Sequence, residues 1–161
     1  ERRYGSSVEY INTAVGGTVS TWGRENVEAN INQYNPNLVV IGFGMNDACT
    51  GIIPSTYIEN MSFMVESIQS NCPNADIILC ATILANPNSS QYSYQDMFLE
   101  PLLELEDKYE NLAVLDMTTY SKDLFKKKNS LELLANNINH PCDFLVRGYV
   151  SNLMHLIECD E

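Results

Sequence analysis

The sequence predicts an α/β protein in which helices cover both faces of a parallel β-sheet. Short apolar stretches rich in β-branched residues alternate along the chain with longer amphipathic stretches, and this alternation is typical of parallel strands joined by helical crossovers. The chain has 161 residues, of which 45% are hydrophobic, enough for one domain with its own core. No repeat or linker divides it, so we expect a single domain over residues 1–161.

Strands are expected where apolar runs end abruptly at Gly, Asn, Asp or Pro. The central run, VVIGF at residues 39–43, is followed by Gly44-Met45-Asn46-Asp47, as when a buried parallel strand ends in a functional loop. An earlier alternating stretch, VEYI, predicts a strand that leads into the turn at Gly16-Gly17. The predicted strands cover residues 8–11, 38–43, 76–82 and 112–116.

Helices are expected where apolar residues recur every three or four positions. Ile58, Met61 and Ile68 follow this spacing, and the Asn-Cys-Pro-Asn sequence at 71–74 ends their helix. The predicted helices cover residues 25–34, 56–70, 95–109, 121–128 and 143–158. The connecting segments 51–54, 86–94 and 136–141 are expected to be loops.

Charge and composition exclude several classes of function. The formal net charge is −12, so the chain repels nucleic-acid phosphates, and no apolar run approaches the length of a membrane span. The basic triplet at 126–128 is interpreted as a solvated helix end. The five cysteines are scattered without a C-x-x-C pair, which argues against a zinc site or a disulfide framework. We expect no metal and no cofactor.

Three loops carry residues suited to chemistry. Ligands of open α/β sheets bind outside the carboxyl ends of the strands. There, the backbone N–H of Gly17 and the side-chain amide of Asn46 can both donate to an oxyanion, and Asp47 can pin the turn beside Asn46. His140 is a candidate general base, whereas His155 falls within an amphipathic helix and is interpreted as structural. Taken singly, the glycine turn and His140 are also typical of ordinary loops.

In combination, these motifs resemble those of SGNH hydrolases, the GDSL esterase/lipase superfamily. The family's second, third and fifth blocks match residues 12–17, 44–47 and 137–141 in order, over nearly the whole chain. The match is most similar to carbohydrate-esterase-like members in bacteria. The resemblance implies a flavodoxin-like three-layer α/β/α fold and ester hydrolysis through a serine acyl-enzyme. It also implies that Gly17 and Asn46 are oxyanion-hole donors and that His140 is the base.

Two departures from the family pattern stand out. The opening Gly-Asp-Ser block is absent, and Ser6 and Ser7 come too late to replace it, so the first strand and the nucleophile are expected upstream of residue 1. Asn137 occupies the place of the family's aspartate, and an amide cannot offset the charge of an imidazolium. Either a backbone carbonyl or another carboxylate orients His140. Asp143 is the candidate carboxylate, with helix N-cap as its alternative role.

The sequence therefore predicts a serine ester hydrolase, removing small acyl groups such as acetyl from a carbohydrate or another small molecule. Two alternatives remain open at this stage. One is a lipase, a thioesterase or a peptide-specific member of the same superfamily. The other is a catalytically inactive relative that serves as a carbohydrate-binding or scaffolding module.

Overall fold

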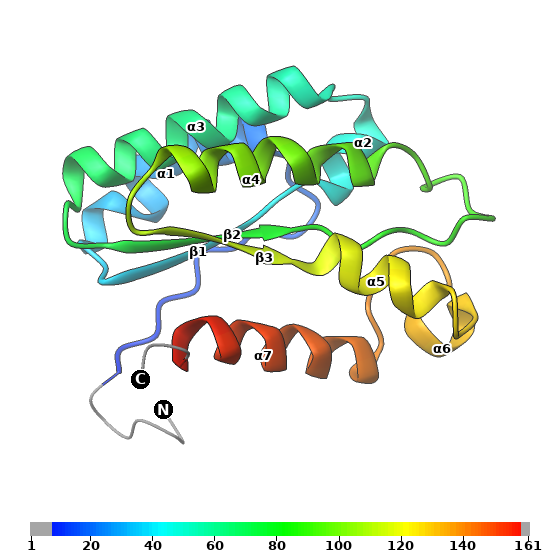
Figure 1. Ribbon diagram of the computed structural model, residues 1–161. Coiled ribbons are helices and arrows are strands. Elements are labelled where there is room, and N and C mark those ends of the chain that lie inside the picture. Colours follow the sequence, from blue (N-terminus) through cyan, green and yellow to red (C-terminus); the bar gives the residue numbers. More distant parts are fainter. Residues whose placement is uncertain (1–7, 159–161) are drawn as a thin grey trace.

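The computed structural model describes residues 8–158, and a parallel sheet of three strands lies at its centre (Figure 1). Ile77 of the middle strand lies opposite Val39 on one side and Leu112 on the other. The strands, in sheet order, are β1 (Leu38–Gly42), β2 (Asp76–Ala81) and β3 (Leu112–Asp116). Because all three run in the same direction, their carboxyl ends meet at one edge. The predicted α/β class with a parallel sheet is confirmed.

Helices cover the sheet on both faces. The helices are α1 (Ser20–Asn30), α2 (Met45–Thr50), α3 (Pro54–Asn71), α4 (Leu99–Lys108), α5 (Met117–Phe125), α6 (Ser130–Leu133) and α7 (Asp143–Glu158), with 3₁₀ turns η2 (Asn32–Tyr34) and η3 (Gln95–Phe98). Figure 1 shows α1, α3 and α4 on one face and α7 on the other, which makes three layers. Within residues 8–158, none of the helices has the length and apolarity needed to cross a membrane.

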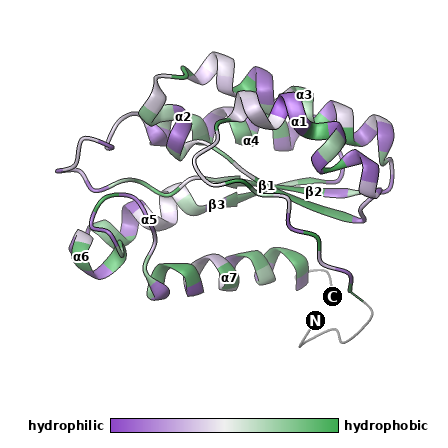
Figure 2. Cartoon of the chain, turned by 180° about the vertical axis from the view of Figure 1, so that it is seen from behind, coloured by the Kyte–Doolittle hydropathy of each residue, from purple (hydrophilic) through white to green (hydrophobic). Residues whose placement is uncertain are grey.

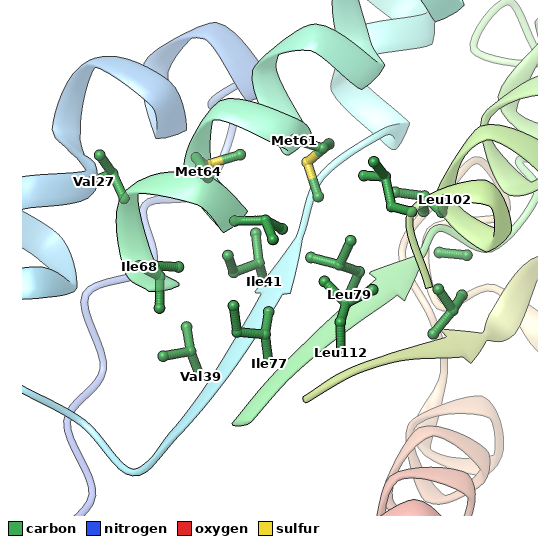
Figure 3. Close-up of a cluster of buried hydrophobic side chains, with 14 of the residues drawn as sticks. Val27, Val39, Ile41, Met61, Met64, Ile68, Ile77, Leu79, Leu102 and Leu112 are labelled. Atoms are coloured by element: carbon green, nitrogen blue, oxygen red, sulfur yellow. The ribbon is translucent and has the colours of Figure 1, made fainter. Parts of the chain in front are cut away.

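The larger core lies between the sheet and the α1, α3 and α4 layer (Figure 3). Val39 and Ile41 of β1 point into it and are 7% and 4% exposed. From α3, the side chains of Met61, Met64 and Ile68 pack against them. The helical spacing that predicted α3 therefore reflects its buried face.

A second, smaller core lies on the opposite face, under α7. Ile78 of β2 and Leu115 of β3 pack there against Leu145, together with Leu133 and Leu134 just before the last loop. No residue of β1 belongs to this cluster. The α7 layer therefore supports the middle strand and β3 but not β1.

β1 is consequently the least covered strand. Leu38 and Val40, whose side chains point away from the larger core, are 41% and 49% exposed. In the described part of the chain β1 pairs with β2 alone, so its other edge has no strand partner. α7 carries hydrophobic residues along most of its length (Figure 2), including Val146 and Val150, which are also exposed. An uncovered apolar surface thus follows β1 on the α7 side of the sheet.

The predicted strand at residues 8–11 was wrong. This segment has no regular secondary structure, and Val8, Tyr10 and Ile11 are exposed. A strand forms only when its backbone N–H and C=O groups pair with a partner edge, and this segment pairs with none of the described strands. The alternating pattern of residues 8–11 indicates a preference for extended backbone, but it does not show whether a partner strand is present.

Several helix ends also differ from the prediction. The helix expected at 25–34 begins at Ser20 and gives way to the 3₁₀ turn η2, and the segment expected to form a loop after Gly44 is the start of α2. Residues 95–98 are likewise a 3₁₀ turn that precedes α4, and the short helix α6 was not expected. α5 begins at Met117 rather than 121, because the Asp116 carboxylate accepts the Thr119 N–H at 2.8 Å and caps it.

The two faces of β1 predict different costs for the same substitution. Val39→Ala should lower the free energy of unfolding by about 2 kcal/mol, since two buried methyl groups are lost. Val40→Ala, its neighbour, should cost about 0.5 kcal/mol or less because that side chain is already half exposed. Urea denaturation of both variants measures the difference. Equal losses would contradict the assignment of the two faces.

Candidate active site at the carboxyl end of the sheet

Gly44 shapes the turn where the chain leaves β1. Its φ angle of 120° is one that side chains rarely permit, and a Cβ there would lie 3.1 Å from Thr82 Cγ2 and 3.3 Å from a ring carbon of Phe98. No residue with a side chain fits this turn without strain. Gly44 thereby directs the chain into α2, so that Asn46 and Asp47 lie in the first turn of this helix.

Asp47 joins this turn to the start of α1. Its side chain is fully buried. One carboxylate oxygen accepts the Gly44 N–H at 2.9 Å, and the other accepts the Ser20 N–H at 2.9 Å. Ser20 is the first residue of α1, whose free N–H groups and dipole favour a negative charge. The carboxylate therefore fixes two segments that are 27 residues apart in the chain.

Asn46 lies beside the glycine turn. Its Nδ2 donates to the carbonyl oxygen of Thr18 at 3.0 Å, and the preceding Gly17 adopts a φ of 82°. The structure thus brings together the segments of two residues that the sequence singled out. Within residues 8–158, neither the Gly17 N–H nor the second Nδ2 hydrogen of Asn46 has a hydrogen-bond acceptor. An amide carries two donors, so Asn46 can hold Thr18 with one and offer the other to a substrate.

A hollow of about 210 Å³ opens at this point. Its walls come from the β1 exit, the glycine turn, β2 and α7. The lining residues are Thr18, Gly42, Phe43, Gly44, Met45, Asn46, Cys80, Thr82 and Tyr149. The sequence does not indicate Cys80 and Tyr149 as lining residues, because Cys80 lies within the apolar run of β2 and Tyr149 reaches the hollow only because α7 packs under β2.

The thiol and phenol in this hollow are not activated nucleophiles. Burial raises the pKa of Cys80 to about 12 and raises the pKa of Tyr149 above its usual range. Both groups are therefore protonated at neutral pH. Among residues 8–158, no serine lines the hollow. Ser20, at the start of α1, is fully buried, and its hydroxyl accepts from Asn60 Nδ2 at 3.0 Å.

Two other cysteines flank the sequence motifs. Burial raises the pKa of Cys49, whose Sγ donates to the carbonyl of Gln91 at 3.4 Å, so this thiol is not activated either. Cys142 donates to the carbonyl of Glu132 at 3.1 Å. In the described part of the chain, no group of three His, Cys, Asp or Glu residues is arranged to hold a metal ion.

His140 belongs to the loop between α6 and α7. Figure 1 shows this loop on the side of the sheet toward which the strands point. His140 is exposed and does not line the hollow. Asn137 does not hydrogen-bond the imidazole: its Oδ1 accepts from Ser130 Oγ at 2.6 Å and from Asn86 Nδ2 at 3.3 Å. Asp143 is exposed and is the first residue of α7. The structure therefore unites Asn46 with the glycine turn and leaves His140 on a separate loop.

Known proteins resemble this chain in sequence and in fold. The model of the GDSL-like Lipase/Acylhydrolase family matches residues 1–141. An arylesterase from Vibrio mimicus is 29% identical over 97 residues, which are 60% of this chain and 46% of that relative, so the match spans just under half of its length. The acetylxylan esterase Axe2 from Geobacillus stearothermophilus has the same fold, with a TM-score of 0.79 at 14% identity, covering 92% of this chain and 71% of that structure.

The geometry around Asp47 predicts a large loss of stability on its removal. Asp47→Ala should lower the free energy of unfolding by about 2–5 kcal/mol, since two buried backbone N–H groups lose their acceptor. Asp47→Asn, which keeps one acceptor oxygen, should lose less. Urea denaturation measures both changes, and Glu59→Ala, which removes an exposed carboxylate, is the control. A loss for Asp47→Ala no greater than that of the control would refute the bridging role.

Proposed function

The chain belongs to the GDSL-like lipase/acylhydrolase family, and from this premise we propose that it carries the oxyanion hole and the general base of a serine ester hydrolase. The observation that carries the proposal is the Asn46–Thr18 hydrogen bond, which sets the side-chain amide beside Gly17 at the mouth of the hollow. Donors that are held before the substrate arrives stabilise the charge that develops on the carbonyl oxygen.

The proposed reaction is acyl transfer in two halves. A serine attacks the ester carbonyl, its proton passes to His140, and the oxyanion accepts hydrogen bonds from the Gly17 N–H and from Asn46 Nδ2. The alcohol leaves with the proton from His140. Water then cleaves the acyl-enzyme by the same steps, which returns the proton to serine.

The serine itself is proposed to lie outside this chain, on a strand that pairs with the free edge of β1. Two features support this. In the described part of the chain no serine lines the hollow. In the same residues the outer edge of β1 has no neighbouring strand, and Leu38 and Val40 are exposed. A strand in that position would end beside Gly44, at the same edge as Asn46. On this proposal, residues 1–161 form most of one hydrolase domain.

The proposed substrate is a small acyl ester, with acetyl groups on a carbohydrate as the first choice. The hollow is smaller than the sites of about 300–1,000 Å³ that hold drug-sized ligands, which favours a short acyl group. Aryl esters are the second choice, because the Vibrio relative is named an arylesterase. Hydrolysis rates measured on a panel of acetyl, aryl, lipid, thioester and peptide-linked substrates would distinguish these alternatives.

The proposal predicts the effects of two substitutions in the full-length protein. Asn46→Ala should lower kcat on p-nitrophenyl acetate by about a hundredfold or more, the usual cost of one oxyanion donor, while KM changes little. His140→Ala should abolish nearly all turnover, whereas His155→Ala should leave it close to the wild-type value. Asn137→Ala should have a mild effect, because its side chain bonds Ser130 and Asn86 rather than the imidazole.

A fluorophosphonate probe completes the test, because it labels only an activated serine. Labelling that maps to a serine, together with the two rate losses, supports the hydrolase. If the full-length protein neither hydrolyses esters nor takes up the label, the proposed function fails. A carbohydrate-binding or scaffolding module on the same fold would then replace it.

A further inference from the structure

The loop that carries His140 is closed at its base. We call residues 135–140 the histidine loop. Leu134 and Pro141 form an antiparallel bridge, and the Ala135 N–H donates to the carbonyl of His140 at 2.9 Å. Leu133 and Leu134, directly before the loop, are 0% and 1% exposed and belong to the core under α7. Both ends of this exposed loop are therefore attached to a rigid base.

The Asn136 side chain organises the interior of the loop. Its Oδ1 accepts the N–H groups of Ile138, Asn139 and His140, each at 3.0 Å. Its Nδ2 donates to Asn139 Oδ1 at 3.1 Å. One carboxamide thus replaces the backbone partners that three successive residues of a short loop cannot find for themselves.

Both backbone polar groups of His140 are consequently satisfied within the loop. The N–H donates to Asn136 Oδ1 and the C=O accepts from Ala135. These two bonds fix the peptide planes on either side of the Cα atom. They therefore set the direction in which the Cα–Cβ bond carries the imidazole.

Asn137 has a different task from its neighbour. Its backbone has a φ of 54°, and its carbonyl accepts from Asn86 Nδ2 at 2.8 Å. The Asn86 N–H donates to the carbonyl of Ile138 at 2.7 Å, and Asn86 is only 6% exposed. Asn86 follows β2 in the chain, so this pair attaches the whole loop to the segment that leaves β2 rather than orienting the imidazole.

We propose that Asn136 is the positioning residue for His140, holding the backbone from which the imidazole acts. The inference rests on the proposed function, since it takes His140 as the general base. It assigns the orienting role to the Asn136 side chain, which acts on the backbone of His140, rather than to the side chain of Asn137 or Asp143. An imidazole displaced by about 1 Å loses on the order of a hundredfold in rate.

Two variants of Asn136 and one control test the proposal in the full-length protein. Asn136→Ala removes the acceptor, so amide hydrogen exchange at His140, followed by NMR, should speed up by about tenfold or more. Its kcat on p-nitrophenyl acetate should fall by about 10- to 100-fold with KM within about twofold. Asn136→Asp keeps Oδ1 and should restore slow exchange and most of kcat. Asn139→Ala, which removes only the Nδ2 contact, should match the wild type in both measurements.

The two readouts separate this proposal from the proposed function. Unchanged exchange at His140 in Asn136→Ala, or a loss of kcat that Asn136→Asp does not rescue while its exchange stays slow, overturns the positioning role. Full kcat in His140→Ala overturns the proposed function and with it the catalytic part of the inference. In that case the exchange rates still decide whether Asn136 holds the backbone of His140.

Discussion

The buried carboxylate of Asp47 is the contact on which the geometry of the candidate site depends. It accepts hydrogen bonds from the N–H of Gly44 at the β1 exit and from the N–H of Ser20 at the start of α1. Neither donor has another partner in a helix or strand, and a buried N–H without an acceptor is costly. The bridge therefore stabilises the turn after β1 and also decides where α1 begins. α2 has six residues, too few for an isolated helix to be stable.

The two halves of the site are braced independently. Asn46 and Gly17 belong to the half that Asp47 fixes, and their neighbour Thr18 closes the contact between them. His140 belongs to a loop that is fixed by Asn136 and attached to the β2 exit through Asn86. In both halves a short polar side chain satisfies backbone groups that no regular element covers. The relative placement of the halves then depends on the sheet, because β1 and β2 carry one half each.

The sheet is covered unevenly, and this bears directly on the half of the candidate site that contains Asn46 and Gly17. β2 is paired on both edges and buried on both faces, whereas β1 is paired on one edge and leaves Leu38 and Val40 exposed. Exposed strand edges with apolar side chains favour the addition of another strand. Since Asn46 lies four residues after the end of β1, a parallel strand added at that edge would end beside the proposed oxyanion-hole donors. The strand proposed to carry the serine would therefore pair with the outer edge of β1, the edge that has no partner in residues 8–158.

Local pattern in the sequence determined the three strands of the sheet and the long helices, and it pointed to the candidate site residues. β3 and α7 have the predicted bounds, because an apolar run between turn residues and a helical apolar spacing are each complete within one segment. Tertiary structure decided what depends on a distant partner. Residues 8–11 are irregular because they pair with no strand of the sheet. α1 begins at Ser20, whose N–H donates to the Asp47 carboxylate 27 residues along the chain. The same holds for the place of Tyr149 in the hollow and for the attachment of the histidine loop to Asn86, 51 residues from Asn137. Hydrogen bonds and packing between remote segments set these features, and no local periodicity records them.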